Sequence, residues 1–239
     1  MVEPLRLEVC VDTPEGLETA LAAGADRIEL CAALALHGLT PAPGLMARAA
    51  GGNAWPMIRP RAGDFVFSPA EDDAMRRDID AARAAGLPGV VLGASRPNGE
   101  LDADLLARLI AHAAGLGHSL HRAFDLAPDL GVALETAIAL GFERVLTSGG
   151  AHTAPEGAAH LADLVAVASG RIVVMAGSGV TANNVGDLVR ATGVTEVHAS
   201  CSGPAVSRAE VDTLGFEDPG RRETSADAVR AMAAALRAA

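Results

Sequence analysis

Residues 23–30, with the sequence AGADRIEL, join the end of a helical segment to a short strand-like run through a glycine. The same pattern returns as AAGLPGVVL at residues 84–92 and as LGFERVL at residues 140–146. A helix that ends at glycine and is followed directly by a β-rich run is typical of the helix-to-strand loops of α/β proteins. The recurrence predicts a chain built from modular strand and helix units.

Short β-rich runs and Ala-rich amphipathic stretches alternate along the whole chain. Eight such runs predict the closed (β/α)8 barrel called a TIM barrel, whereas five or six would predict an open doubly wound sheet, which is the alternative fold. The predicted strands are Arg6–Val11, Arg27–Leu30, Met57–Arg59, Gly89–Gly93, Ser119–Ala123, Arg144–Thr147, Ile172–Ala176 and Glu196–Ser200. The predicted helices are Pro14–Ala23, Pro43–Ala50, Ser68–Ala85, Asp102–Ala114, Leu130–Leu140, Gly157–Ala168 and Asn183–Ala191.

The length of 239 residues predicts a single TIM-barrel domain spanning residues 1–239, because one such barrel takes about 250 residues. Residues 202–224 are rich in Pro, Gly and charged side chains and predict a long loop. Residues 225–239 predict a C-terminal helix that begins at a Ser225 cap and closes the outer layer.

Composition and charge exclude several classes of function. The net charge of -11 and the absence of any Lys/Arg run argue against nucleic acid as a partner. No apolar run is long enough to span a membrane and no leader precedes the first strand, so we expect a cytoplasmic protein without a membrane partner. All 19 basic residues are Arg, which excludes a Schiff-base lysine and a pyridoxal phosphate (PLP) cofactor. A metal ion or a small anionic molecule is the expected partner.

Polar side chains gather at the carboxyl ends of the predicted strands, which is where TIM barrels carry their chemistry. Strand alternation places Glu8 and Glu29 inside the barrel, because parallel strands are apolar on the side that faces the helices. Buried carboxylates need partners, and Arg59 and Arg61 are the predicted ones, in a catalytic site or in a purely structural layer of salt bridges. The full candidate catalytic set is Glu8, Glu29, Arg59, Arg61, Asp64, His121 and Asp125.

The ends of the last three predicted strands carry small and polar residues that suit an anion. The loop Gly177-Ser178-Gly179 precedes a helix, and in many barrels this position binds phosphate through backbone N–H groups. A tight turn without a ligand is the alternative interpretation. The candidate anion-binding residues are Ser148, Gly177, Ser178, Gly179, His198 and Ser200.

Cys10 and Cys31 follow Glu8 and Glu29 by two residues on strands that are predicted neighbours, so the two thiols are expected to lie close together. Soft metals such as Cu(I) prefer thiolate ligands, although buried cysteines most often serve as small apolar residues. Cys201 follows the last strand with the opposite parity to Ser200, and its role is left open.

The motifs LEVCVDT, AGADRIELCA, GLTP, IRPRAGDF, HRAFD, RVLTSGG, MAGSGV and EVHAS occur between about Leu7 and Ser202. In this order and spacing the sequence resembles the CutC family, which is described as a family of copper homeostasis proteins. The resemblance implies a cytoplasmic barrel, a homo-oligomer such as a dimer or tetramer, and binding or trafficking of Cu(I). By motif, the proposed thiolates fall on Cys10 and Cys31.

The hard oxygen, guanidinium and imidazole groups of the predicted ring suggest a second function, that of an enzyme. In this hypothesis His121 or Glu29 transfers a proton and the arginines neutralise a small anionic substrate, which the glycine loop holds if it is phosphorylated. Without lysine, the chemistry expected is that of an acid–base isomerase, lyase or hydrolase.

Overall fold

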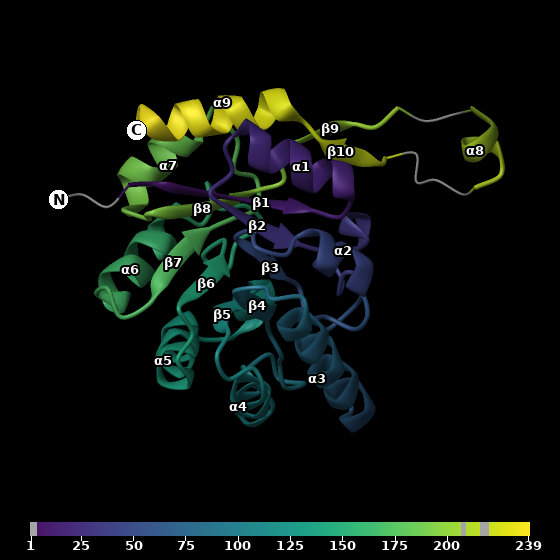
Figure 1. The fold of residues 1–239 in the computed structure, drawn as a ribbon. Helices are drawn as coiled ribbons and strands as arrows, with labels where there is room; N and C mark the ends of the chain where they lie inside the picture. Colours follow the sequence, from purple (N-terminus) through teal and green to yellow (C-terminus); the bar gives the residue numbers. More distant parts are fainter. Residues whose placement is uncertain (1–3, 207–208, 216–219) are drawn as a thin grey trace.

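Eight parallel strands form a nearly closed barrel, which confirms the predicted TIM-barrel fold (Figure 1). We describe a computed structural model, which covers residues 4–206, 209–215 and 220–239. The strands of the barrel are β1 (Arg6–Val11), β2 (Arg27–Leu30), β3 (Ala54–Pro56), β4 (Gly89–Leu92), β5 (Gly117–Leu120), β6 (Arg144–Thr147), β7 (Val173–Ala176) and β8 (Glu196–Ala199).

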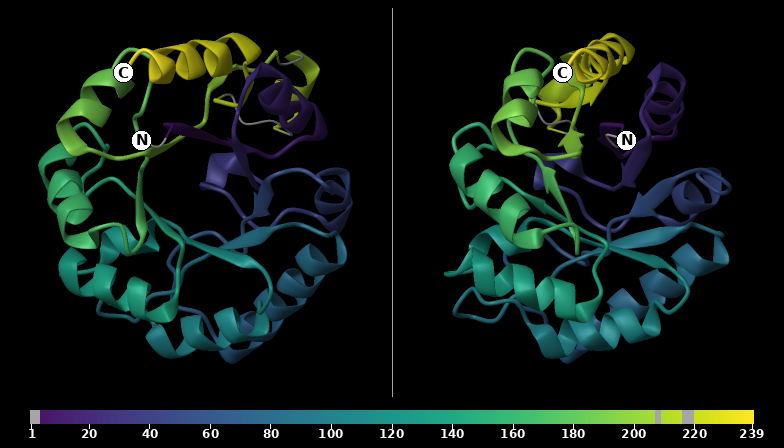
Figure 2. Two further views of the ribbon diagram at one scale, coloured as in Figure 1. Left: turned by 60° about the vertical axis from the view of Figure 1, so that its left-hand side comes forward. Right: turned by 90° about the vertical axis from the view of Figure 1, so that its left-hand side faces the viewer.

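The sheet runs in the order β3-β2-β1-β8-β7-β6-β5-β4, so its two edges are β3 and β4. A parallel bridge between Met57 and Val91 joins these edges, and the Ile58 N–H donates to the Val91 carbonyl at 2.9 Å. The strands therefore form a ring, with the helices around the outside (Figure 2).

The outer layer packs its apolar side chains against the strands in one continuous core. The helix α9 contacts α1 and α7, so it closes the ring of helices across β1 (Figure 1). The helices and 3-10 turns of the barrel are α1 (Pro14–Ala23), η1 (Leu34–Leu36), α2 (Pro43–Arg48), α3 (Pro69–Ala84), α4 (Ala103–His112), η2 (Arg122–Leu126), α5 (Leu130–Leu140), α6 (Ala158–Ala168), α7 (Val185–Thr192) and α9 (Ala226–Arg237).

Side-chain caps explain where several helices begin. The Ser68 hydroxyl accepts from the Glu71 N–H while the Glu71 carboxylate accepts from the Ser68 N–H, which forms a capping box. The Ser225 hydroxyl accepts from the Ala228 N–H, as the sequence predicts for the last helix. None of the helices in the described part of the chain combines the length and the apolar character needed to cross a membrane.

The third strand lies earlier than predicted, at Ala54–Pro56 instead of Met57–Arg59. After Met57 the backbone leaves the ladder, because the Arg59 N–H donates to the Thr40 hydroxyl and the Arg59 carbonyl accepts from the Thr40 N–H. The strand β3 ends at Pro56, and proline has no N–H to donate to a sheet ladder.

The fifth strand also ends earlier than the predicted Ser119–Ala123. His121 accepts a hydrogen bond from the Ala123 N–H through Nδ1, and this contact begins the 3-10 turn η2. The side chain of His121 therefore ends the strand that it follows.

Residues 202–224, predicted as a long loop, contain regular structure. The short strands β9 (Ser202–Pro204) and β10 (Arg222–Thr224) pair in antiparallel fashion, and α8 (Ala209–Thr213) lies between them in the chain. This hairpin projects from the barrel beside α1 and α9 (Figure 1).

Candidate functional site

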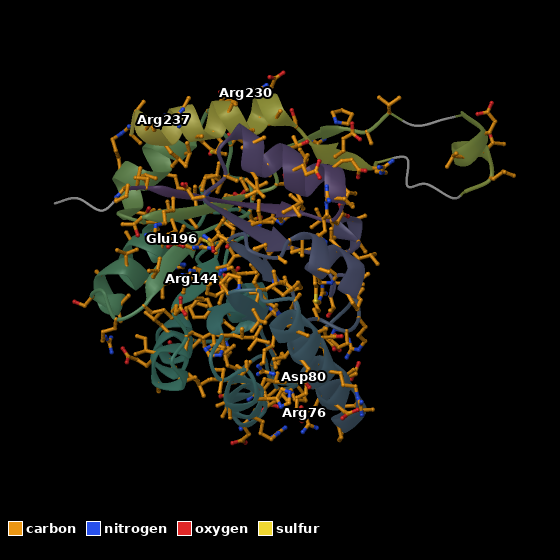
Figure 3. The ribbon with its side chains drawn as sticks, in the orientation of Figure 1. Arg76, Asp80, Arg144, Glu196, Arg230 and Arg237 are labelled. Carbon is orange, nitrogen blue, oxygen red and sulfur yellow. The ribbon has the colours of Figure 1, made fainter. Side chains whose placement is uncertain are left out.

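A network of alternating charges lies inside the barrel. Register pairs Glu8 of β1 with Arg27 of β2 and with His198 of β8, so all three side chains project to the same side of the sheet. Arg27 forms salt bridges with both Glu8 and Glu196, and Arg144 Nε lies 3.3 Å from Glu196 Oε2. Arg144 and Glu196 lie beside each other in Figure 3. Each charge of this network has an opposite charge in contact with it.

Trp55 lies beneath these guanidinium groups. Its ring is 4.4 Å from the Arg144 guanidinium carbon and 5.9 Å from that of Arg27. The ring fits because β4 and β5 carry glycine here: a Cβ atom at Gly89 or Gly117 would lie 2.6 or 2.4 Å from the indole. None of Arg27, Arg144, Glu196 and Trp55 was predicted as a site residue, although period-two alternation from Glu29 already places Arg27 on the inner face.

Glu8 was predicted to pair with Arg59 or Arg61, and that prediction is wrong. Arg61 instead binds Asp64 at 2.8 Å and Glu71 at 2.5 Å. Arg59 lies beyond the end of β3, and its guanidinium donates only to backbone carbonyls, those of Leu36, His37, Gly38 and Gly63. Arg27 takes the predicted role because it starts the strand next to Glu8.

A second cluster continues from Glu8 toward the carboxyl ends of the strands. The His198 Nδ1 lies 2.8 Å from Glu8 Oε1, and the His198 Nε2 lies 3.9 Å from Glu29 Oε2. Cys10, Glu29 and His198 each offer a ligand atom, and these atoms all lie within 4.8 Å of one another. We call this group the Cys10–Glu29–His198 cluster. The Cys31 thiol donates to Glu29 Oε2 at 3.6 Å, so a second thiol adjoins it.

The electrostatics of the two carboxylates differ. Burial alone would raise the pKa of Glu8, but the hydrogen bond from His198 and the charge of Arg27 lower that pKa to about 2. Burial raises the pKa of Glu29, which has no salt bridge as close. Burial would lower the pKa of His198, yet the neighbouring Glu29 and Cys10 raise it well above its usual value. An ionised Glu8 therefore lies beside the cationic His198 of the cluster.

The remaining cysteines are less reactive than free thiols. Burial and the Glu29 charge raise the pKa of Cys31 well above its usual value. Burial and the nearby Cys10 raise the pKa of Cys201 to about 11. All three cysteines are free. Cys201 has a φ of 44° and packs with the apolar core between strands and helices, unlike Cys31, which packs with Trp55 inside the barrel.

The donor set of the cluster fits a transition metal. His198 uses Nδ1 to contact Glu8, which leaves Nε2 facing Glu29 and Cys10. A carboxylate that orients the second nitrogen of a histidine is a regular feature of metal sites. Sulfur and imidazole suit Cu(I), whereas the Glu29 oxygen is a harder donor that suits Zn²⁺ better.

Asp125, a predicted catalytic residue, is saturated by contacts within the protein. Its carboxylate accepts from the Arg122 Nε at 2.7 Å, the Gly150 N–H at 3.1 Å and the Ser148 N–H at 3.2 Å, and also from the Thr147 hydroxyl. The Ser148 hydroxyl binds Asp125 and the Ala151 carbonyl. The loop after β6 thus binds an anion through its backbone, and that anion is the carboxylate of Asp125.

The loop after β7 packs against the loop after β6. The Ser178 hydroxyl donates to the His152 carbonyl at 2.9 Å, and a Cβ atom at Gly179 would lie 2.8 Å from Thr153. A Cβ atom at Gly177 would lie 2.5 Å from Leu146. Close packing therefore accounts for both glycines. The Ser200 hydroxyl accepts from the Ser202 hydroxyl at 3.1 Å.

The predicted site residues thus divide into separate groups. Glu8, Glu29, Cys10, Cys31 and His198 come together inside the barrel. Arg59 and His121 lie at another sector of the interior, where each contacts the ring of Phe65. The residues held in other contacts are Arg61, Asp64, Asp125, Ser148, Gly177, Ser178, Gly179 and Ser200.

Comparison with known proteins places the chain in a family. Residues 5–203 match the family model described as the CutC family. A CutC family protein of Sinorhizobium medicae (strain WSM419) is 60% identical over 96% of this chain and 95% of its own length. A CutC family protein of Caulobacter vibrioides (strain NA1000 / CB15N) is 57% identical over 97% of each chain. The crystal structure of a CutC from Streptococcus agalactiae, named for copper homeostasis, superposes with a TM-score of 0.79 at 33% identity, covering 82% of this chain and 98% of that one. The chain therefore belongs to the CutC family.

Proposed function

We propose that this protein binds Cu(I) at the Cys10–Glu29–His198 cluster and serves copper homeostasis. The observation that carries the proposal is the convergence of a thiol, an imidazole and a carboxylate within 4.8 Å of one another inside the barrel. The family name and the name of the Streptococcus agalactiae relative support copper as the metal. The ion is cargo in this proposal, not a resident catalytic cofactor.

In the proposed site Cys10 Sγ and His198 Nε2 bind the metal directly. Glu8 holds the other imidazole nitrogen at 2.8 Å and so fixes the ring in the binding orientation. Cys31 supplies the second thiolate, since its sulfur already contacts Glu29 beside the cluster. Two soft sulfurs and one imidazole give Cu(I) the ligands that it prefers.

The test is an anaerobic Cu(I) titration against a competing chromophoric chelator. We expect Cys10→Ser to weaken Cu(I) binding at least about 100-fold and Cys31→Ser about tenfold, because metal affinity depends on both the ligands and their neighbours. Ser169→Ala is the control, since it removes an exposed hydroxyl at the end of α6, away from the cluster, and should leave the affinity unchanged. Wild-type affinity in the Cys10→Ser Cys31→Ser double variant would show that the thiolate site is wrong.

A second function, that of an acid–base enzyme acting on a small anionic substrate, is favoured by one observation. The pKa values of Glu8 and Glu29 move in opposite directions although both carboxylates contact His198. Pairs of titratable groups with separated pKa values often mark a proton donor and its counter-charge. In this hypothesis Glu29 is the proton donor of an isomerase, lyase or hydrolase. Mass spectrometry of the natively purified protein should then find an organic anion bound to the wild type and not to Glu29→Gln.

The cellular setting follows as part of the same proposal. Three unpaired thiols suit the reducing cytoplasm, which is where we propose that the protein acts. We also propose a homo-oligomer, and sedimentation equilibrium of the metal-free and Cu(I)-loaded protein measures its size. A monomer under both conditions would contradict the oligomer.

A further inference from the structure

Four buried polar atoms without a hydrogen-bond partner among the described residues lie in one sector of the barrel interior, beside β3, β4 and β5. Others, such as Glu29 Oε1 and Arg144 Nη1, lie elsewhere in the interior. In the described part of the chain no hydrogen-bond partner exists for Arg59 Nε, Ser95 Oγ, Ser119 Oγ or His121 Nε2. All four residues are buried, with exposed fractions between 1% and 5%. Native proteins pair roughly 90% of their buried polar groups, so four unpaired atoms in one sector point to a ligand.

Strand register shows that this sector faces the interior. Ser119 of β5 pairs with Val91 of β4, whose side chain packs with Trp55 inside the barrel. His121 lies two residues after Ser119 and therefore projects to the same side. Gly93 makes room for the imidazole, because a Cβ atom at this position would lie 2.1 Å from the ring.

The ring of Phe65 connects the members of the group. It lies 4.9 Å from the Arg59 guanidinium carbon and 4.8 Å from the centroid of the His121 ring. The Phe65 carbonyl accepts from the Ser95 N–H at 2.9 Å. Arg59, Ser95 and His121 therefore share one neighbour, and Ser119 lies on β5 two residues before His121.

Arg59 is a buried cation without a buried counter-charge. Its Nη atoms donate to neutral carbonyls, and no carboxylate among the described residues forms a salt bridge with it. Burying an unpaired charge is costly, so this arrangement favours an anion beside Arg59.

His121 adds a neutral donor. Its Nδ1 accepts from the Ala123 N–H at 3.1 Å, so the ring proton resides on Nε2. Burial and the Arg59 charge lower the pKa of His121 to about 3, which keeps the imidazole neutral at physiological pH. The unpaired Nε2–H therefore points to an acceptor that the protein does not supply.

We propose that Arg59, Ser95, Ser119 and His121 form a binding site for a small organic carboxylate inside the barrel. The neighbouring Arg61 is already paired with Asp64 and Glu71, so Arg59 leaves a single positive charge to balance, which a monoanion matches and a phosphate dianion would exceed. The imidazole N–H and the two hydroxyls complete a set of donors around the carboxylate oxygens. The site contains none of the residues of the Cys10–Glu29–His198 cluster, so it can be tested on the metal-free protein.

The test uses the full-length protein, freed of metal with a chelator, and acetate as the probe. Acetate is titrated at constant ionic strength with chloride as the replaced anion, while side-chain ¹⁵N NMR follows the histidines. We expect the Nε2 and Nε2–H signals of His121 to move saturably and the thermal midpoint to rise. In Ser119→Ala the acetate dissociation constant should increase about tenfold, as expected for losing one hydrogen bond to a charged group.

Controls separate this site from other sources of an anion effect. Ser169→Ala removes an exposed hydroxyl at the end of α6 and should bind acetate as wild type does. Phosphate in place of acetate should leave the His121 signals unmoved. The proposal is overturned if acetate does not move the His121 signals, or if Ser119→Ala retains wild-type affinity. Because the acetate titration uses the metal-free protein, neither of these results would bear on the proposed Cu(I) site, which the Cu(I) titration tests separately.

Discussion

The barrel interior has two polar sectors that differ in how their charges are balanced. Around β1, β2 and β8, Glu8, Arg27 and Glu196 contact one another, and His198 contacts Glu8. Around β3 to β5, Arg59 forms no salt bridge among the described residues and donates to backbone carbonyls, and His121 Nε2 has no hydrogen-bond partner there. A balanced network rigidifies the barrel, whereas an unbalanced one leaves a place for a ligand. Removing single groups should therefore have opposite consequences in the two sectors.

The largest expected effect is acid destabilisation through His121. Its pKa falls from 6.5 in the unfolded chain to about 3 in the folded one, so the unfolded state binds the proton first. The stability that the neutral ring contributes is complete above pH 6.5 and is lost as pH falls toward 3, by roughly 5 kcal/mol. Urea unfolding of the wild type and of His121→Asn between pH 6.5 and pH 3 measures this loss of unfolding free energy. A difference between them that does not change with pH would contradict the buried neutral ring.

Arg27→Met should cost about 3–5 kcal/mol of unfolding free energy. The substitution leaves Glu8 and Glu196 buried with fewer cationic partners, and an unpaired buried charge is strongly destabilising. Arg61→Met is the control, because Arg61 is 38% exposed and solvent screens its salt bridges, so its loss should destabilise the protein far less. Equal losses in the two variants, measured by urea unfolding, would show that the interior network is no stronger than a surface pair.

Gly93→Ala should cost about 1–3 kcal/mol, because the added methyl group meets the His121 ring at 2.1 Å. Gly44→Ala in α2 is the matched control, since nothing lies within 4 Å of a Cβ atom there. Thermal unfolding of both variants distinguishes them. Equal midpoints would mean that His121 does not occupy the space over Gly93.

The smallest effect is expected from Ser119→Ala in the ligand-free protein. Because its hydroxyl has no partner, its removal should change the unfolding free energy by less than about 0.5 kcal/mol. Ser148→Ala removes a buried hydroxyl that contacts Asp125, Arg122 and the Ala151 carbonyl, and it should cost about 1–3 kcal/mol. If the two serine variants lose equal stability, the hydroxyl of Ser119 has a partner in the free protein.

The fold was predictable because each strand and helix unit has its own local sequence pattern, a helix that ends at glycine followed by a β-rich run. The three helix-to-strand phrases of the sequence coincide with the observed entries into β2, β4 and β6, and the helices α1 and α5 have the predicted bounds. The errors lie where side chains redirect the backbone. The Arg59 N–H donates to the Thr40 hydroxyl and not to a neighbouring strand, and the Ala123 N–H donates to His121 Nδ1 at the end of β5. Hydrophobic periodicity predicts neither contact.

The site was predictable only in part. Alternation along β1 and β2 correctly placed Glu8 and Glu29 inside, because that inference needs only one strand at a time. To predict which buried charges pair, one needs the register between strands, which the sequence does not specify. Arg59 was therefore predicted as the partner of Glu8, whereas the register places Arg27 beside it. The same limit affected Asp125, whose partners come from a loop more than twenty residues away.

X-ray absorption at the copper edge of the Cu(I)-loaded protein tests the metal site most directly. The account predicts a first coordination shell with both sulfur and nitrogen, from Cys10, Cys31 and His198, and the loss of sulfur scattering in the Cys10→Ser Cys31→Ser variant. A shell that contains no sulfur in the wild type, or one that the double variant leaves unchanged, would contradict a metal site at the Cys10–Glu29–His198 cluster.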